Sequence, residues 1–406
     1  EMLRSLVGSE MCIRDRRVGC KTILFIFVLL ECAFSGVASD NENHSSLEAQ
    51  IEAIFNKMKM TGLGIAVVKG DSIVYVHSWG YKEVPTVNNQ GILLKNDDLF
   101  RIASVSKTFV ATTILQLVEE GVLNLDDDVQ KFLKFPLRNP SYRDKPITVR
   151  MLLTHTSSIN DSQRWWSLDI INPIISDNYA KCFSETKPGM EYKYCSIGHL
   201  LLGAVIEGAT GNRFDTEIDS RIMKPLDIQG GFNCNLLDST KFVRLYRYNK
   251  ESGAFREDDE AYRPYRYQIQ THYTLGKSIG LVYPDSGMKI TTTDLAKYMM
   301  MHMKGGTLRQ ATILSLRSEM MMRENYVGKN NYGFAFRQYR GLVPNTTLYG
   351  QTGGGFGLKS AMIFDPKHQM GFVIICSGSA SEYIDGYNDI HKPLIKLLYN
   401  YFSEND

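Results

Sequence analysis

The chain has 406 residues, of which 43% are hydrophobic and 22% are charged, so it can fill a sizeable core and is not intrinsically disordered. The 46 basic and 44 acidic residues nearly cancel to a net charge of +2, whereas nucleic-acid-binding proteins normally carry a clear basic excess. We therefore expect a globular enzyme or binding domain with no nucleic-acid partner.

The N-terminal region has the pattern of an export signal. Basic residues precede a short apolar run at 22–30, and small residues follow at 36–39. The run is shorter than the roughly 20 apolar residues that a membrane-spanning helix needs. We expect a signal peptide cleaved near Ala38 or Ser39, no stable membrane span after cleavage, and a periplasmic or secreted protein.

The first predicted elements after the signal are a β-hairpin and two helices. Residues 64–81 are rich in β-branched and aromatic residues and are broken by a turn signal at 69–72. Apolar residues then recur at helical spacing over residues 109–122 and 197–211, with a glycine at or next to the end of each segment.

A Tyr- and Arg-rich segment, residues 242–275, follows the second helix. Aromatic and basic residues in alternation can form a groove for single-stranded nucleic acid. Acidic residues interrupt this segment, and residues 249–253 have the composition of a turn. The segment therefore predicts a solvated hairpin or a substrate loop.

The C-terminal part predicts a third helix, a second hairpin and a closing helix. The third helix covers residues 292–303, and strands flank a turn near 365–367 within residues 360–378. The closing helix is predicted over residues 382–402. Because hairpins from opposite ends of a chain can pair, we expect them to share one antiparallel sheet.

No metal or nucleotide cofactor is expected. The eight histidines are scattered, with no H-E-x-x-H motif, and the glycines at 353–357 lack the lysine of a P-loop. Four cysteines follow the signal segment, match no zinc pattern and allow three complete pairings, between which the sequence does not choose: Cys182, Cys195, Cys234 and Cys376.

Four motifs offer a serine nucleophile, and their contexts differ. Ser278 lies in a G-x-S-x-G motif, which needs a strand before it and a helix after it, and neither is predicted there. Two S-x-x-K motifs, at 184–187 and 286–289, lie among turn signals. The third, at 104–107, opens the strongly amphipathic first helix.

The Ser104–Lys107 spacing fits nucleophilic catalysis. Residues i and i+3 lie on one helix face, so the lysine can reach the hydroxyl. The helix N-terminus favours developing negative charge and offers free N–H groups for an oxyanion. A lysine acts as a base only when neutral, which requires burial or a neighbouring cation. The alternative interpretation of this tetrapeptide is a capping serine followed by a solvated lysine.

Two further motifs occur in chain order after this pair. Tyr194-Cys195-Ser196 precedes the second helix, and Gln351-Thr352-Gly353 lies on a predicted strand edge. A Ser-Lys pair, a Tyr-x-polar motif and an x-Thr-Gly strand in this order resemble the class C β-lactamase, D-alanyl-D-alanine carboxypeptidase and esterase family of penicillin-recognising serine hydrolases. The resemblance covers about residues 47–401.

The resemblance implies a role for each motif residue. Ser104 would be the acylated nucleophile, Lys107 its proton acceptor, and Tyr194 the group that passes the proton to the leaving group. The oxyanion would lie between the N–H groups of Ser104 and Gly354. The substrate-binding residues would be Ser196, Gln351, Thr352, Gly353 and Gly354.

Two positions depart from the family pattern and shift the expected substrate. Ser196 stands where an Asn is usual, and neutral Gln351 stands where a Lys or His usually helps to bind a substrate carboxylate. We therefore expect a serine hydrolase acting on an ester, amide or peptide, with a small-molecule or peptide substrate such as a cell-wall fragment. The alternatives are a catalytically weak penicillin-binding-like sensor or binding protein, and a true D-Ala-D-Ala carboxypeptidase or β-lactamase.

The expected fold is α/β (α+β), with an antiparallel sheet that is flanked by helices and built from both chain ends around an inserted, mainly helical region, as in β-lactamase/transpeptidase-like proteins. Residues 1–16 resemble the translated scar of a sequencing adaptor and are expected to be non-native. The other expected boundaries are a signal peptide at 17–39 and a hydrolase domain at 47–401, with an α/β part near 47–125 and 285–401 and a helical insert near 126–284. The sequence leaves the oligomeric state open.

Overall fold

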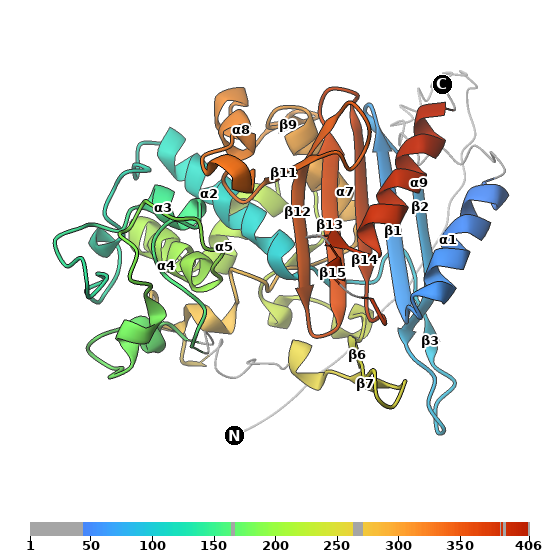
Figure 1. Cartoon of the computed structure of the whole chain (residues 1–406), viewed down its shortest axis with the longest axis horizontal. Coiled ribbons are helices and arrows are strands. Elements are labelled where there is room, and N and C mark those ends of the chain that lie inside the picture. The colour runs from blue at the N-terminus through green and yellow to red at the C-terminus, as the bar shows by residue number, and fades with distance from the viewer. Residues whose placement is uncertain (1–43, 164–166, 263–270, 382, 385–386, 405–406) are drawn as a thin grey trace, which may run out of the picture. The chain divides into compact units, whose positions relative to one another are not determined.

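A central antiparallel sheet contains strands from both ends of the described chain (Figure 1). The computed structural model describes residues 44–163, 167–262, 271–381, 383–384 and 387–404, and the predicted signal peptide lies outside them. In spatial order the strands are β11 (Arg337–Arg340), β12 (Thr347–Gly355), β13 (Leu358–Asp365), β14 (Met370–Cys376), β1 (Gly62–Lys69), β2 (Ser72–Glu83) and β3 (Ile92–Leu93).

The register of this sheet confirms that the two predicted hairpins share it. β1 and β2 form the first hairpin, and β13 and β14 form the second. β1 pairs with β14 along its length, for example Ile65 with Ile374 and Val67 with Phe372. The long chain between the hairpins therefore leaves the sheet and returns to it.

Alternating residues of the central strands supply two hydrophobic clusters. Leu63, Ile65 and Val67 of β1 face the cluster that α1 (Ser45–Lys57) and α9 (His391–Glu404) complete. Their neighbours Ala66 and Val68 belong to the other cluster, which includes α7 (Thr292–Met303). This period of two is the pattern of a strand buried on both faces.

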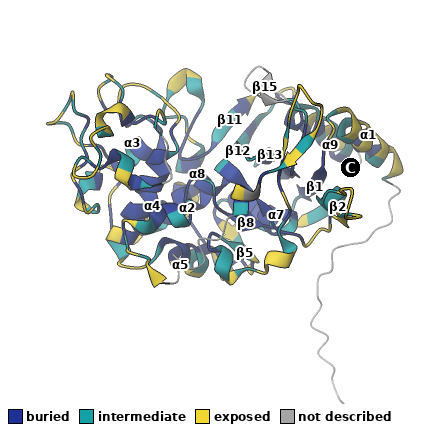
Figure 2. Cartoon of the chain, turned by 90° about the horizontal axis from the view of Figure 1, so that it is seen from below, coloured by how far each residue is buried: buried dark blue, intermediate teal, exposed yellow. Residues whose placement is uncertain are grey.

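The cluster that includes α7 also contains residues from the remaining α-helices of the described chain. They are α2 (Ser106–Glu119), α3 (Val149–Leu153), α4 (Ile197–Thr210), α5 (Phe214–Ile218) and α8 (Leu316–Arg323). α2 and α4 are buried along most of their length, up to the last turn (Figure 2). Gly121 and Gly211, at φ of +72° and +74°, follow their C-terminal ends. The three predicted central helices are confirmed, and α7 has the predicted bounds.

The predicted closing helix is wrong at its N-terminal end. α9 begins at His391 rather than at residue 382, and the short strands β15 (Tyr383–Ile384) and β16 (Tyr387–Asn388) precede it. Proline lacks an N–H and is tolerated only in the first turn of a helix. Pro393 therefore places the start of the helix close to His391.

Short strands outside the central sheet form small sheets of their own. β4 (Phe100–Arg101), β8 (Lys289–Ile290) and β5 (Gly230–Gly231) form one small sheet, and β9 (Thr307–Leu308) pairs with β10 (Ala311–Thr312). β6 (Tyr246–Tyr248) and β7 (Phe255–Glu257) form the hairpin predicted within the Tyr- and Arg-rich segment.

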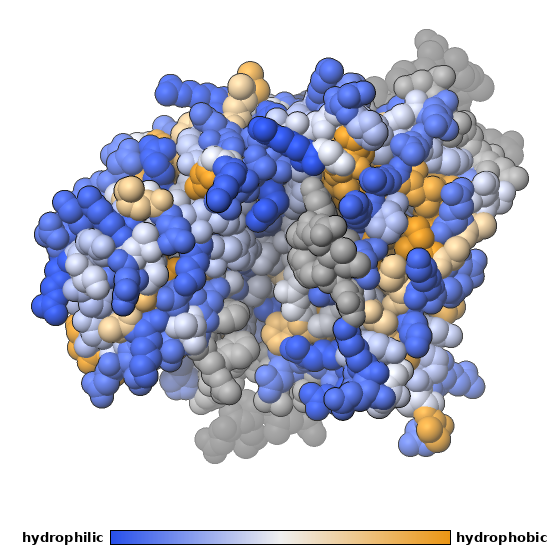
Figure 3. Space-filling model, in the orientation of Figure 1, coloured by the Kyte–Doolittle hydropathy of each residue, from blue (hydrophilic) through white to orange (hydrophobic). Residues whose placement is uncertain are grey.

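Hydrophobic packing, without disulfides, holds the described part of the chain together. Cys182, Cys195, Cys234 and Cys376 are all free, so none of the three possible complete pairings forms. On the face drawn in Figure 3, hydrophobic residues lie in small separate patches among hydrophilic ones. No helix of the described residues is long and apolar enough to cross a membrane.

Candidate active site

The structure brings Ser104 and Lys107 together at the start of α2. Ser104 lies in the 3-10 turn η1 (Ala103–Val105), which continues directly into the helix. Lys107 Nζ donates to Ser104 Oγ over 3.0 Å and to the carbonyl oxygen of Asp285 over 2.9 Å. Ala103 has a left-handed φ of +44°, an unfavourable conformation of the kind that clusters at functional sites.

Lys107 is fully buried, and opposing effects act on its pKa. Burial lowers the pKa of Lys107, but the neighbouring Tyr194, Asp285 and Asp161 raise it, and the net direction is upward. This direction favours the ammonium form, which agrees with donation of a hydrogen bond to Ser104. It differs from the neutral lysine that a free base requires.

Tyr194 lies over the same ammonium group. Lys107 Nζ is 5.2 Å from the centre of the Tyr194 ring, and 37% of this tyrosine is exposed. The ring packs against His155, with 4.3 Å between the ring centres. His155 Nδ1 accepts from the Cys195 N–H, and burial together with Lys107 and Arg337 holds the pKa of His155 well below its usual value. A neutral histidine therefore supports the Tyr194 segment.

Asp161 fixes the backbone of this segment, although it belongs to none of the predicted motifs. Its two carboxylate oxygens accept the Ser196 N–H over 2.9 and 2.7 Å, and Oδ1 also accepts the Ile197 N–H over 3.1 Å. The carboxylate thus caps the N-terminus of α4, where the helix dipole favours negative charge. Because Asp161 is 35 residues from Ser196, no local pattern connects them.

We expect Asp161→Ala to lower both stability and activity. Loss of the cap is expected to reduce the free energy of unfolding by about 1–2 kcal/mol, measured by urea denaturation. It should also lower kcat/KM for ester hydrolysis, because the Tyr194 segment loses its anchor. Ser315→Ala, which removes the cap of α8, is the matched control and should affect stability alone. Equal losses of kcat/KM in both variants would contradict a positioning role for Asp161.

The predicted x-Thr-Gly strand lies directly beside the Ser104 turn. A Cβ added to Gly353 would lie 2.5 Å from the Ile102 carbonyl oxygen and 2.8 Å from the Ser104 backbone nitrogen. Only glycine therefore permits this approach of β12. Ser360 of the neighbouring strand donates to the same Ile102 carbonyl over 2.7 Å.

Gln351 is turned toward a buried tyrosine. The residue is 3% exposed, and its Nε2 donates to the Tyr332 hydroxyl over 3.0 Å. Tyr332 also makes a 3.2 Å hydrogen bond with His155 Nε2. Gln351 Oε1 accepts the N–H of Thr352 over 3.2 Å. A contact of Gln351 or Thr352 with substrate stays a prediction.

Ser104 opens into a cavity of about 290 Å³. The wall includes three predicted site residues, Ser104, Ser196 and Gly354. The complete lining is Arg101, Ala103, Ser104, Ser196, Arg247, Tyr283, Asp285, Ser286, Gly354, Gly355 and Phe356. The predicted nucleophile and two of the predicted substrate-binding residues thus share one cavity.

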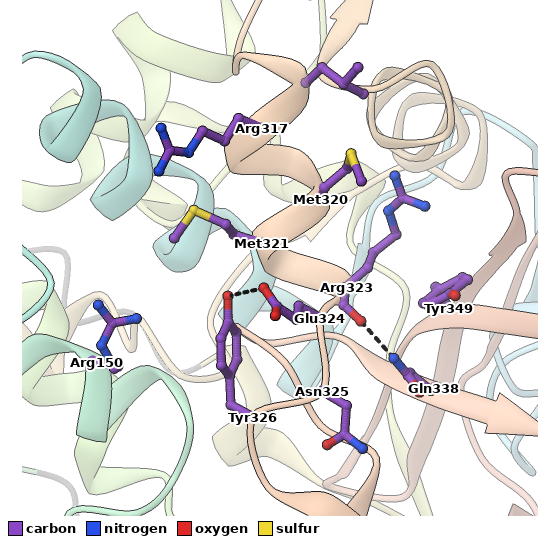
Figure 4. Close-up of a pocket in the computed structure, with 11 residues that line it drawn as sticks. Arg150, Arg317, Met320, Met321, Arg323, Glu324, Asn325, Tyr326, Gln338 and Tyr349 are labelled. Carbon is purple, nitrogen blue, oxygen red and sulfur yellow. Dashed lines mark hydrogen bonds between the residues drawn. The ribbon is translucent and has the colours of Figure 1, made fainter.

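A larger cavity of about 1060 Å³ lies beside α8 (Figure 4). Arginine, methionine and tyrosine side chains dominate its wall, and Arg150 and Arg323 are bound to Asp126 and Glu319. In Figure 4, Tyr326 donates to Glu324. Its described lining contains no serine or cysteine, so it offers no counterpart to the Ser104–Lys107 pair.

The competing serine motifs lack the required geometry. Ser278 lies in the 3-10 turn η9 (Ser278–Leu281), no strand occurs in residues 271–277, and its Oγ accepts the Thr274 N–H over 2.9 Å. Lys289 donates to the Phe232 carbonyl over 3.0 Å, while Ser286 accepts from Arg101. Ser184, of the remaining S-x-x-K motif, donates to the Ser158 carbonyl over 3.1 Å. The described residues show no hydrogen bond between Ser184 or Ser286 and the lysine of its own motif.

Comparison with known proteins agrees with these features. A family model described as Beta-lactamase matches residues 48–391. Penicillin-binding protein 4* of Bacillus subtilis (strain 168) is 27% identical over 316 residues, which cover 75% of this chain and 61% of that protein. Protein flp of Staphylococcus aureus (strain MRSA252) is 28% identical over 46% of this chain and 37% of that protein. This chain thus spans less than two thirds of the length of these curated relatives.

Two solved structures show the same mixed α/β fold. The octameric penicillin-binding protein homologue from Pyrococcus abyssi superposes with a TM-score of 0.68 at 25% identity, over 88% of this chain and 78% of that chain. D-amino acid amidase from Ochrobactrum anthropi SV3, complexed with L-phenylalanine amide, superposes with a TM-score of 0.65 at 20% identity, over 89% of this chain and 100% of that chain. With the family match extending over most of its length, the chain belongs to the Beta-lactamase family of serine hydrolases.

Proposed function

We propose that this protein is an exported serine hydrolase that forms an acyl-enzyme at Ser104 with an ester, amide or peptide substrate. One observation carries the proposal: a fully buried Lys107 donates a 3.0 Å hydrogen bond to the hydroxyl of Ser104, which lines a cavity. Export rests on the N-terminal sequence pattern.

In the acylation step, Ser104 Oγ attacks the substrate carbonyl carbon and its proton passes to the Lys107–Tyr194 pair. The carbonyl electrons move to oxygen, and the N–H groups of Ser104 and Gly354 are the proposed donors to this oxyanion. The bond to the leaving group then breaks, and the pair returns the proton to it. In deacylation, water attacks the acyl carbon and gives its proton to the same pair. The pair then protonates Ser104 Oγ as the ester bond breaks, which releases the acid and restores the serine hydroxyl.

The upward shift in the pKa of Lys107 favours a shared role for lysine and tyrosine. Burial lowers this pKa, while Tyr194, Asp285 and Asp161 raise it, with a net upward direction. An ammonium at Lys107 stabilises negative charge on Ser104 Oγ, and the pair accepts the serine proton after it has lost one of its own. The base is therefore the coupled pair rather than a free lysine.

The size of the cavity favours a small acyl group. Its volume of about 290 Å³ lies at the lower end of the range for ligand pockets, roughly 300–1000 Å³. A solved structure with the same fold is an amidase complexed with an amino acid amide. We therefore place small esters and amides ahead of long peptides as substrates.

A second candidate function is a binding or sensor protein that is acylated but turns over slowly. Gln351 favours it, because this neutral side chain is buried against Tyr332 where the family usually keeps a cation. This candidate predicts a stable acyl adduct with negligible hydrolysis.

One experiment tests both candidates. The purified protein is treated with a fluorophosphonate and with a labelled penicillin, and intact mass followed by peptide mapping locates any adduct. The proposal predicts an adduct on Ser104 and turnover of at least one member of a panel containing nitrocefin, a D-Ala-D-Ala peptide and short-chain esters. An adduct without turnover would select the sensor, and no adduct on Ser104 with any probe would refute both.

A further inference from the structure

We infer that Arg247 is a specificity-determining residue that binds a carboxylate carried by the substrate close to its scissile carbonyl. The inference rests on the proposed function at Ser104. Arg247 belongs to β6 of the hairpin β6–β7 and lines the same cavity as Ser104. The hairpin thus brings a cation to the cavity from a segment far from the family motifs.

The guanidinium of Arg247 is available to a ligand. Its side chain is 55% exposed, and its Nε–H donates to Asp258. Among the described residues this is the one hydrogen bond that Arg247 makes, so its terminal N–H groups remain for another acceptor. A planar guanidinium can hold a carboxylate through two parallel hydrogen bonds.

The other guanidinium of the cavity is already occupied. Arg101 is 3% exposed and donates through its three nitrogens to the Ser286 and Ala261 carbonyl oxygens and to Ser286 Oγ. Rings of Tyr283 and Phe356 lie 5.3 and 4.5 Å from its guanidinium carbon. Arg101 therefore builds the wall, and Arg247 is the cation left for substrate.

The fold holds Arg247 in this position. The Tyr246 N–H donates to the Ser377 carbonyl over 3.0 Å at the end of β14. Gly357, at φ +93°, follows β12, and a Cβ there would lie 1.9 Å from the Tyr246 carbonyl oxygen. The Phe356 ring lies 5.6 Å from the Arg247 guanidinium. The hairpin is thus docked on the β12–β13 turn that borders the cavity.

The remaining charges are compatible with an anionic ligand. Asp285 is the acidic residue of the described cavity wall, and it is 2% exposed. Burial raises the pKa of Asp285, and the neighbouring cations Lys107 and Arg101 act against this shift and offset its charge. With Gln351 neutral and turned toward Tyr332, Arg247 supplies at the cavity the charge that the motif strand lacks.

Two ester substrates with the same acyl group test the inference. One carries a free carboxylate close to the scissile carbonyl, and in the other this carboxylate is blocked as a methyl ester. Arg247→Gln is expected to lower kcat/KM for the carboxylate substrate about tenfold, mainly by raising KM, as expected for loss of a charge-assisted hydrogen bond. The neutral substrate should change by less than about twofold. Arg247→Lys should retain part of the preference.

Arg256 offers a matched control on the same hairpin. It pairs with Arg247 in the register, is exposed, and does not line the cavity, so Arg256→Gln removes the same charge without removing the contact. Gly357→Ala should displace the hairpin and reproduce the loss of preference. Equal effects of Arg247→Gln on both esters, or an equal effect of Arg256→Gln, would overturn the inference. A wild-type protein that neither hydrolyses an ester nor forms an adduct on Ser104 would instead refute the proposed function.

Discussion

Replacing Ser104 with alanine is expected to lower kcat for a short-chain p-nitrophenyl ester by at least about 10⁴-fold, because the covalent step loses its nucleophile. The adduct with a fluorophosphonate should disappear as well. Any hydrolysis that remains faster than the uncatalysed reaction in water would come from the oxyanion donors and from substrate binding in the cavity. Initial rates and intact mass, measured on the same preparation, give both results.

Ser286→Ala is the matched control for this variant. Ser286 lines the same cavity and begins its own S-x-x-K motif, but its Oγ accepts from Arg101 and its lysine donates to Phe232. We expect Ser286→Ala to lower kcat by less than about tenfold, because a hydrogen bond and not the nucleophile is lost. Ser278→Ala should leave the rate close to that of the wild type.

The opposite ranking would contradict the assignment of Ser104. Full activity in Ser104→Ala together with loss in Ser286→Ala would move the nucleophile to the second motif. Loss in Ser278→Ala alone would support the G-x-S-x-G motif despite its 3-10 conformation. Urea denaturation of each variant separates these outcomes from loss of the fold.

Local patterns predicted the elements whose boundaries local chemistry determines. The 292–303 helix is correct at both ends because the Thr291 side chain accepts the Asp294 N–H over 2.9 Å and Gly305 follows at φ +74°. The start of the closing helix was wrong because the prediction rested on apolar spacing alone and took no account of Pro393. The shared sheet was predictable because the sequence shows a hairpin near each end of the chain, and two such hairpins can pair in one antiparallel sheet.

The Ser104–Lys107 contact was predictable because it depends only on helical spacing. Its environment was not predictable, because it comes from distant segments. The Asp285 carbonyl that accepts from Lys107 is 178 residues away, and Tyr332 is 177 residues from His155. Such contacts follow from packing, and no periodicity in one segment encodes them.

The charge of the site shows the same division. The neutral Gln351 is visible in the sequence, but its burial against Tyr332 is visible only in the structure. Arg247 stood in a segment predicted as a solvated hairpin or a substrate loop, and the docking of Tyr246 on the turn after β12 brings this arginine to the cavity. A cation missing from one motif therefore does not establish that the cavity lacks one.

The second large effect is expected for Lys107→Met. Removing the group that holds Ser104 should lower the acylation rate by about 10²–10⁴-fold, the usual contribution of a positioned acid or base. Stopped-flow acylation by a labelled penicillin or a fluorophosphonate measures this step. Lys289→Met is the matched control, since Lys289 is also buried and belongs to the second S-x-x-K motif. Both variants should lose stability, and only Lys107→Met should lose acylation.

The pH dependence separates a free lysine base from the coupled pair. Burial lowers the pKa of Lys107, but Tyr194, Asp285 and Asp161 raise it and the net direction is upward, so kcat/KM for a neutral ester should keep rising from neutral into alkaline pH. Tyr194→Phe removes the strongest raising effect. The rise should then move to lower pH, and the maximum should fall because the proton shuttle is lost.

Asp285→Asn distinguishes the charge effect from the shuttle. It removes a second group that raises the pKa of Lys107 but keeps the backbone carbonyl that accepts from Nζ and leaves the Tyr194 hydroxyl in place. The rise in kcat/KM should again move to lower pH, with a smaller loss at the maximum than in Tyr194→Phe. If neither variant moves the profile, Lys107 does not set it, and the proton of Ser104 passes to another group.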